Sequence, residues 1–320
     1  MVLIPSIYYT RSPNTEQKRD REHQPKSLVI VAIIATVLLW ASAFPAIRVA
    51  LEAYTPAEVA LLRYIVASAV LIVYALIKRI PLPRWQDLPL IVLCGFIGFT
   101  VYNFMLNAGQ MTVSAGIASF IISSEVGIIA LLAWLFFGER LGRLGWIGVV
   151  LCIAGVGIIA VGKDGTFQLS LGVLRVFMAT LAISVYSIIQ KPLLVRYSPI
   201  HFTTYAIWSG TLFLFFLAPE AVSSAVRAPI APTLAVIYMG LFPGVVAYIA
   251  WSYVLSRIPA SQAGSYLALI PVVALFLAWL WLGEIPTLSA LLGGAMVLAG
   301  VMLVNRRRIK PLIIYMAIKV

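Results

Sequence analysis

A block of seven residues occurs twice in this chain, and both copies lie within apolar runs long enough to cross a membrane. Ala-Trp-Leu-Phe-Phe-Gly-Glu at 133–139 returns as Ala-Trp-Leu-Trp-Leu-Gly-Glu at 278–284. The same spacing, without a gap, aligns further residues downstream: Gly148 with Gly293, Ala154 with Ala299, Gly155 with Gly300 and Val156 with Val301. A repeat of this kind in apolar sequence indicates two copies of one membrane unit.

The composition is typical of a chain that lies almost wholly in a membrane. Hydrophobic residues make up 62% and charged residues 11% of the 320 residues, and the mean hydropathy is +1.03. Soluble domains are about 45–50% apolar and about 25% charged. We therefore expect an all-α integral membrane protein with room for about ten spans of roughly 20 residues.

Ten apolar segments follow one another along the chain, five in each copy of the repeat. They cover about residues 28–51, 57–77, 88–110, 113–138, 144–162, 171–190, 200–217, 234–256, 261–283 and 288–304. Because five is an odd number, the second copy must enter the membrane from the opposite side. We expect ten transmembrane helices as two inverted five-helix repeats around a central cavity, a construction that recurs in secondary transporters. The predicted domains are a cytoplasmic leader at 1–27, repeats at 28–163 and 171–304, and a basic cytoplasmic tail at 305–320.

The basic residues concentrate on one side of the predicted membrane. With a cytoplasmic N-terminus, the inner side collects most of them, among them Lys78, Arg79, Arg84, Arg143, Lys191, Arg196, Arg257 and Arg306 to Arg308. The outer side keeps Arg48, Lys163, Arg175 and Arg227. The positive-inside rule therefore predicts that both termini are cytoplasmic. A net charge of +12 sorted in this way does not predict nucleic-acid binding, which needs basic residues gathered on one surface.

Several stretches resemble the drug/metabolite transporter superfamily, whose members carry paired EamA-type domains. These are Trp-Ala-Ser-Ala-Phe-Pro-Ala at 40–46 and Leu-Arg-Tyr at 62–64 in the first repeat, and Ala-Tyr-Ile-Ala-Trp-Ser-Tyr at 247–253, Pro271 and the block at 278–284 in the second. The similarity covers about residues 28–304. The resemblance implies a ten-helix basket around a central cavity in a bacterial inner membrane, working by alternating access. Similarity to the YddG-type exporters further implies export of aromatic amino acids.

The fourth span departs from the superfamily pattern. Members commonly carry proline after the position of Glu125, and the second repeat keeps Pro271 at the matching place, but Val126 and Gly127 stand in the first repeat. The sequence therefore leaves open whether the fourth helix is interrupted as the ninth is expected to be.

Three aromatic residues are candidates for a substrate-binding cage. Trp40 and Phe44 are four residues apart and share a helix face, and Tyr186 aligns with Phe44 in the second repeat. Such rings could stack on a flat or apolar side chain, since aromatic pairs gain about 0.5–1.5 kcal/mol beyond burial. The alternative is an aromatic belt at the membrane interface or packing against lipid.

Polar and aromatic residues on the third and eighth spans are a second group of substrate-binding candidates. They are Tyr102, Asn103 and Asn107 in the first repeat and Tyr248, Trp251 and Ser252 in the second. Polar groups within a span must be satisfied inside the protein. These residues are therefore expected to face either other helices or a wet cavity.

Serine pairs and one carboxylate complete the candidates. Ser119 with Ser123, and Ser261 with Ser265, are four residues apart; we take Ser123 and Ser265 as substrate-binding candidates, with bonds to their own helix backbone as the alternative. Glu125 lies inside a span, where an ionisable group costs about 2.5–3.5 kcal/mol and by default marks a functional site. It could bind a substrate ammonium or carry a proton, or else belong to a structural pair.

Four other ionisable residues are expected to be structural. Arg63 and Glu58 lie near the start of the second span and predict an ion pair. Glu139 and Glu284 follow the repeated block, where a carboxylate can cap the N-terminus of the next helix.

The leading functional hypothesis is a secondary transporter that exports small amphipathic metabolites, with aromatic and other neutral amino acids favoured. The alternative is a multidrug, purine or threonine-type exporter driven by proton antiport, and passive facilitation is also open.

An intramembrane enzyme would need a nucleophile and base, or metal ligands, within reach of one another. His23 and His201 lie outside the span interiors and Cys94 and Cys152 are isolated. No phosphate-binding loop of an ATP-driven pump occurs.

The expected partners are the lipid bilayer and a small-molecule substrate, with no cofactor, metal or nucleic acid. The fifth and tenth spans are rich in small residues, which let helices approach closely in lipid. They could pack within one chain or between two, so a homodimer is an alternative.

Overall fold

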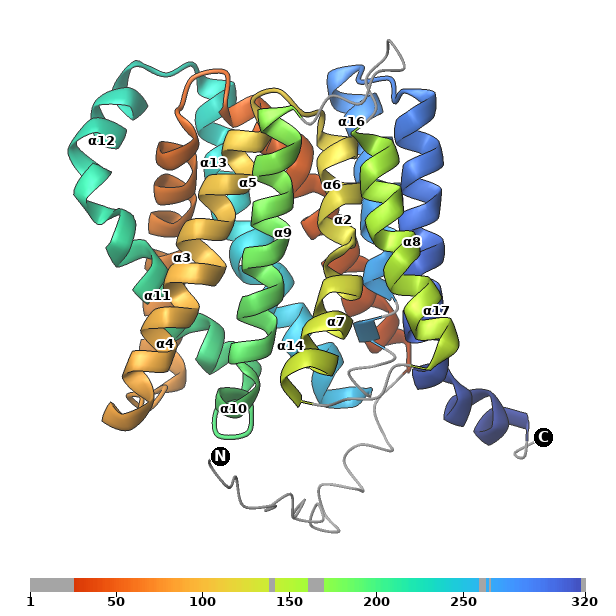
Figure 1. Cartoon of the computed structure of the whole chain (residues 1–320). Coiled ribbons are helices and arrows are strands. Elements are labelled where there is room, and N and C mark those ends of the chain that lie inside the picture. Colours follow the sequence, from red (N-terminus) through yellow and green to blue (C-terminus); the bar gives the residue numbers. More distant parts are fainter. Residues whose placement is uncertain (1–25, 138–141, 161–169, 259–262, 265, 318–320) are drawn as a thin grey trace.

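The computed structural model describes residues 26–137, 142–160, 170–258, 263–264 and 266–317 (Figure 1). Every regular element in these ranges is a helix. Within them, eight helical stretches are long and apolar enough to cross a membrane: Ser27–Ala50, Pro56–Lys78, Trp85–Gln110, Ala115–Phe136, Leu171–Ile189, Pro199–Arg227, Ile230–Arg257 and Leu288–Asn305. Two more apolar stretches, Arg143–Ile159 and Leu267–Leu282, are shorter. The chain is therefore an all-helical, multi-pass membrane protein.

The elements follow the order of the two repeats. The first repeat contains α2 (Lys26–Ala50), α3 (Pro56–Lys78), η1 (Trp85–Asp87), α4 (Leu88–Gly95), η2 (Phe96–Val101), α5 (Tyr102–Gln110), α6 (Ala115–Ser123), α7 (Glu125–Phe137) and α8 (Arg143–Ile159). The second contains α9 (Leu171–Ile189), α10 (Lys191–Leu194), α11 (Pro199–Leu214), η3 (Phe215–Leu217), α12 (Ala218–Arg227), α13 (Ile230–Leu241), η4 (Phe242–Val246), α14 (Ala247–Arg257), η5 (Leu267–Leu269), α16 (Ile270–Leu282) and α17 (Leu288–Ala317).

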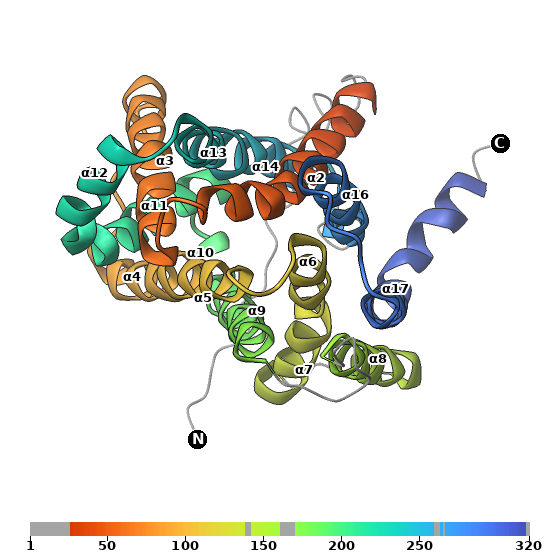
Figure 2. The same cartoon turned by 90° about the horizontal axis from the view of Figure 1, so that it is seen from above.

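The two repeats are interleaved rather than separate lobes (Figure 2). α2, the first helix of the first repeat, packs against α13, α14 and α16 of the second. α9, the first helix of the second repeat, packs in the same manner against α5, α6 and α7 of the first. This exchange brings side chains from both repeats together in the middle of the bundle.

α8 and α17 lie side by side at one end of the bundle (Figures 1 and 2). Their glycines face one another, Gly148 against Gly300 and Gly155 against Gly293. The small-residue faces of these two helices are therefore occupied within one chain. A homodimer stays a prediction, and it would need another surface.

A capping box fixes the start of α3. The backbone N–H of Thr55 donates to Glu58 Oε2 at 2.7 Å, and the N–H of Glu58 donates to Thr55 Oγ1 at 3.3 Å. Ser224 Oγ donates to the other oxygen of the Glu58 carboxylate at 2.6 Å. The expected ion pair between Glu58 and Arg63 is therefore wrong, because residues five apart point about 140° away from each other on an α-helix.

The third membrane helix of each repeat contains a π-helical turn at the same place. η2 ends immediately before Tyr102, and η4 ends immediately before Ala247, one residue ahead of Tyr248. Single π-helical turns inside α-helices occur frequently at functional sites. The turns place Tyr102 and Tyr248 at equivalent positions, each at the start of the α-helix that follows.

The fourth membrane helix of the first repeat is interrupted although it lacks a proline. A turn at Ser124 separates α6 from α7, and Ser124 Oγ donates to the Ile121 carbonyl at 2.6 Å. A serine hydroxyl can compete in this way for the carbonyls of its own helix. In the second repeat, Pro271 lies in the first turn of α16. The open question from the sequence is thus answered: the helix breaks directly before Glu125.

Candidate functional site

Trp40 of α2 makes an aromatic contact with α14. Its ring centroid is 5.3 Å from that of Tyr248, edge to face, and 5.7 Å from that of Trp251. The indole Nε1 donates to the carbonyl of Pro243 in η4 at 3.2 Å. All three aromatic side chains are partly buried. Trp40 of the first repeat therefore contacts two aromatic residues of the second repeat, and the sequence singles out all three.

Phe99 of η2, which is 1% exposed, extends this contact to α3 and α9. Its ring centroid is 6.4 Å from that of Tyr248, 5.5 Å from that of Tyr64 and 5.6 Å from that of Tyr186. The sequence singles out neither Phe99 nor Tyr64 as a site residue. A signal was present in the sequence, because Gly98 and Tyr102 recur at the same spacing as Gly244 and Tyr248 in the second repeat, and Phe99 directly follows Gly98. We call the connected rings the aromatic cluster: Trp40, Tyr64, Phe99, Tyr186, Tyr248 and Trp251.

Arg63 lies beside the aromatic cluster and is 7% exposed. Its Nη1 donates to Asn103 Oδ1 at 3.1 Å, and its Cζ lies 5.2 Å from the centroid of the Tyr64 ring. Asn103, which is fully buried, donates through Nδ2 to Tyr64 Oη at 2.6 Å and to the Phe99 carbonyl at 2.9 Å. Arg63 forms no ion pair with the carboxylates that the structure describes.

Glu125, the first residue of α7, lies halfway along the span Ala115–Phe136 and is only partly buried. It makes no hydrogen bond or ion pair with the described residues. Tyr102 is close enough to interact electrostatically with both Glu125 and Arg63, and so is Tyr248. One carboxylate and one guanidinium thus lie near the same two tyrosines in the middle of the bundle.

The other candidates lie apart from this arrangement or bond to nearby backbone, and Asn107 Oδ1 is buried without a partner among the described residues. Phe44 is buried in a neighbouring apolar core and its carbonyl accepts from Gln110 Nε2 at 3.0 Å. Asn107 donates to the Pro56 carbonyl at 3.0 Å, and Ser123 donates to the Ser119 carbonyl at 2.9 Å. Ser252 is partly buried on α14. Ser265 lies outside the described residues, as do Ser261 and Glu139.

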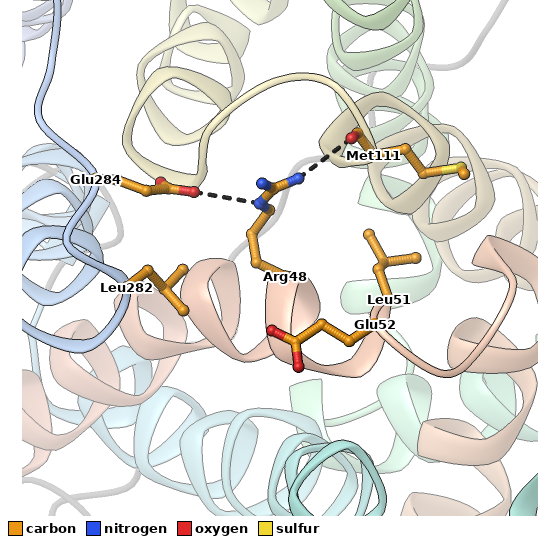
Figure 3. A pocket seen from close by; sticks show the side chains of 6 residues that line it. All are labelled: Arg48, Leu51, Glu52, Met111, Leu282 and Glu284. Carbon is orange, nitrogen blue, oxygen red and sulfur yellow. Dashed lines mark hydrogen bonds and ion pairs between the residues drawn. The ribbon is translucent and has the colours of Figure 1, made fainter. Parts of the chain in front are cut away.

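A pocket of about 310 Å³ lies near the C-terminal ends of α2 and α16 (Figure 3), and its lining residues are different from those of the aromatic cluster. It is lined by Arg48, Leu51, Glu52, Met111, Leu282 and Glu284. Arg48 Nε lies 3.2 Å from Glu284 Oε1, and Arg48 Nη1 donates to the carbonyls of Gln110 at 2.5 Å and Met111 at 3.3 Å. Arg48 and Glu284 are thus paired with each other, whereas Glu52 forms no ion pair with the described residues.

Glu284 also caps a helix, but not the one expected. Its Oε2 accepts from the backbone N–H of Ala115 at 2.8 Å, at the start of α6 in the first repeat. The next helix, α17, is instead capped by Thr287, whose Oγ1 accepts from the N–H of Ala290 at 3.2 Å. The expectation fails for Glu284 because its carboxylate reaches the start of a helix in the other repeat, and Thr287 caps α17 in its place.

The repeated unit matches a known family in both copies. The description of that family is EamA-like transporter family, and the matched residues are 27–161 and 170–306. The chain is 41% identical over 264 residues to the transporter YdfC of Bacillus subtilis, covering 82% of this chain and 86% of that protein. It is 40% identical over 282 residues to a protein of Streptantibioticus cattleyicolor named as a probable terminal-alkyne amino-acid exporter, covering 88% of this chain and 94% of that protein.

Two more distant similarities cover most of the chain. A transporter of Archaeoglobus fulgidus is 30% identical, and the match covers 88% of this chain and all of that protein. A solved crystal structure aligns with a TM-score of 0.59 at 19% identity, covering 89% of this chain and 100% of the other. Similarity at that identity shows a shared fold alone.

Proposed function

The chain belongs to the EamA-like transporter family, and we propose that it exports neutral amino acids with apolar side chains, aromatic ones among them, by alternating access. The family and the relatives make it a membrane transporter of small molecules and not an enzyme. A relative at 40% identity carries the name of an amino-acid exporter. This supports amino acids as the substrate class.

The proposed topology has ten spans in two inverted repeats, at 28–163 and 171–304, in a bacterial inner membrane. The eight long apolar stretches and the two shorter ones in the described ranges would supply the ten. The ends of α3 and α14 and the short α10, which carry Lys78, Arg257 and Lys191, lie at the lower end in Figure 1. By the positive-inside rule this end would be cytoplasmic, together with the leader 1–27 and the tail 305–320.

One observation carries the choice of substrate: Glu125, halfway through a span, pairs with none of the described residues and interacts electrostatically with Tyr102 and Tyr248. A substrate ammonium would supply the missing opposite charge. The aromatic cluster offers rings on which an apolar side chain can pack, and offset or edge-to-face ring contacts gain about 0.5–1.5 kcal/mol beyond burial. A central cavity between the repeats would hold such a substrate.

The same carboxylate favours a second candidate function, namely proton antiport. An unpaired carboxylate within a membrane span is a typical element of a proton relay. In this alternative Glu125 takes up a proton on one side of the membrane and releases it on the other as the substrate moves in the opposite direction.

Uptake into proteoliposomes tests the proposal. Labelled phenylalanine, propargylglycine as a terminal-alkyne amino acid, and threonine are compared at equal pH on both sides, with empty liposomes as the control. We expect saturable uptake of phenylalanine and propargylglycine and weaker uptake of threonine. No saturable uptake of any of the three, with or without a pH gradient, contradicts the amino-acid proposal.

Glu125→Gln separates the two mechanisms, with Glu52→Gln as the matched control because Glu52 lines the remote pocket. If Glu125 binds the ammonium, counterflow at equal pH falls in Glu125→Gln. If Glu125 carries protons, counterflow persists and only gradient-driven uptake is lost.

A further inference from the structure

Arg63 has a buried, positively charged guanidinium group to which the proposed function assigns no role. Its Nη1 bond to Asn103 is the single hydrogen bond that it makes to the described residues, and its Nε is buried without a partner. A guanidinium has five N–H donors in a planar fork that fits a carboxylate with two parallel hydrogen bonds. Most of this capacity is unused inside a membrane span.

Asn103 holds the guanidinium in place. The Phe99 carbonyl can only accept a hydrogen bond, so the Asn103 atom that faces it at 2.9 Å must be Nδ2. This fixes Oδ1 toward Arg63 Nη1 at 3.1 Å. The same Nδ2 also reaches Tyr64 Oη. Because the amide orientation is determined on both sides, Arg63 is positioned rather than free to turn away.

The charged and titratable groups around Arg63 leave its charge uncompensated in the described residues. Tyr64, Tyr102 and Tyr248 are the groups that interact electrostatically with it, and Glu125 interacts with the last two without forming an ion pair to Arg63. A positive and a negative group therefore lie near the same pair of tyrosines. A zwitterion placed between them would offer its carboxylate to Arg63 and its ammonium to Glu125. It would add no net charge to the membrane interior.

We infer that Arg63 binds the carboxylate of the transported amino acid and thereby restricts export to substrates with a free carboxylate. This inference rests on the proposed function and deepens it. The substrate's carboxylate meets Arg63, its ammonium meets Glu125, and its apolar side chain packs on the aromatic cluster. Arg63 is then a specificity-determining residue.

The test compares substrate analogues in the reconstituted wild-type protein. Unlabelled phenylalanine, phenylalaninamide and phenethylamine compete with labelled phenylalanine; the last two lack the carboxylate. We expect the two analogues to compete about 10-fold or more weakly, since hydrogen bonds to charged groups contribute that much to binding. Equal competition by phenylalaninamide overturns the inference without use of any variant.

Arg63→Gln and Arg63→Lys then assign the preference to this side chain. In Arg63→Gln the advantage of phenylalanine over phenylalaninamide should fall toward one, and Arg63→Lys should retain part of it. Arg175→Gln is the matched control, because Arg175 of α9 makes a single weak bond to the described residues, to the Ala108 carbonyl at 3.5 Å. An unchanged preference in a well-folded Arg63→Gln overturns the inference. If the wild-type protein does not transport phenylalanine at all, the proposed function itself fails, which is a different result.

Discussion

Gly155 of α8 and Gly293 of α17 face each other so closely that neither position has room for a Cβ. A Cβ on Gly155 would lie 2.6 Å from the Gly293 carbonyl oxygen, and one on Gly293 would lie 2.5 Å from the Gly155 carbonyl oxygen. Gly148 and Gly300 repeat this contact two turns away, each with 2.6 Å to the other's carbonyl oxygen. The reciprocal pattern shows that the two helices run antiparallel, which supports an inverted relation of the repeats.

Gly155→Ala should therefore destabilise the protein. The nearest atom, the Gly293 carbonyl oxygen, belongs to the backbone and cannot move aside, and overpacking costs about 1–3 kcal/mol. Gly157→Ala on the same helix is the matched control, because a Cβ there would meet no other described part of the chain within 4 Å. Alanine is preferred over glycine in a helix by about 0.5–1 kcal/mol, so this variant should be slightly more stable. Thermal unfolding in detergent measures both; a stabilised Gly155→Ala would contradict the close packing.

Gly98→Ala should impair transport by displacing Tyr186. A Cβ on Gly98 would lie 2.4 Å from the Tyr186 ring, so the ring must leave its contact with Phe99. At the equivalent glycine of the second repeat, Gly244, the nearest atom is the Met239 carbonyl oxygen at 3.0 Å. We expect a larger loss of phenylalanine uptake in Gly98→Ala than in Gly244→Ala. Equal effects would show that the position of Tyr186 does not matter for transport.

Trp40→Ala should lower phenylalanine uptake about 10-fold, because it removes ring contacts with Tyr248 and Trp251 that contribute about 0.5–1.5 kcal/mol each. Trp40→Phe keeps a ring but loses the bond to the Pro243 carbonyl. Its uptake should lie between that of the wild-type protein and that of Trp40→Ala. Trp134→Ala is the control, since Trp134 is 44% exposed and contacts a different ring. A similar loss in both alanine variants would assign the effect to general destabilisation.

The sequence predicted the helices, the repeat and the family, because apolar runs and a repeated block depend on local pattern alone. It also singled out Trp40, Tyr248 and Trp251 as separate candidates for substrate binding, and that role stays a prediction. It did not predict the tertiary contacts between residues that are far apart in the sequence. The repeat alignment equates Gly148 with Gly293, whereas packing brings Gly148 against Gly300, because the two helices are antiparallel.

Arg63 shows the same limit for a charged residue. Proximity in sequence suggested Glu58 as its partner, but the helix turns the two apart and Glu58 is used as a cap. The actual partner, Asn103, comes from α5, forty residues further along the chain. Only the packing of α3 against α5 could reveal this pair.

Glu284→Gln should remove the ion pair that joins the two repeats near the C-terminal ends of α2 and α16. Arg48 on α2 pairs with Glu284 after α16, and the side chains are 33% and 18% exposed. For a pair this exposed, a double-mutant cycle with Arg48→Gln should give a coupling of about 0.2–1 kcal/mol, and about 1 M salt should reduce it. Glu52→Gln is the control, because Glu52 lines the same pocket without an ion pair to the described residues.

Transport gives the second measurement of this pair. α2 and α16 belong to different repeats. If the proposed alternating access separates their ends on this side, the Arg48–Glu284 pair breaks as the protein opens. If opening on this side limits the rate, Glu284→Gln should raise the rate of phenylalanine counterflow, whereas Glu52→Gln should leave it unchanged. A coupling near zero in the cycle, together with an unchanged rate, would show that the ends of α2 and α16 are held together by apolar packing instead.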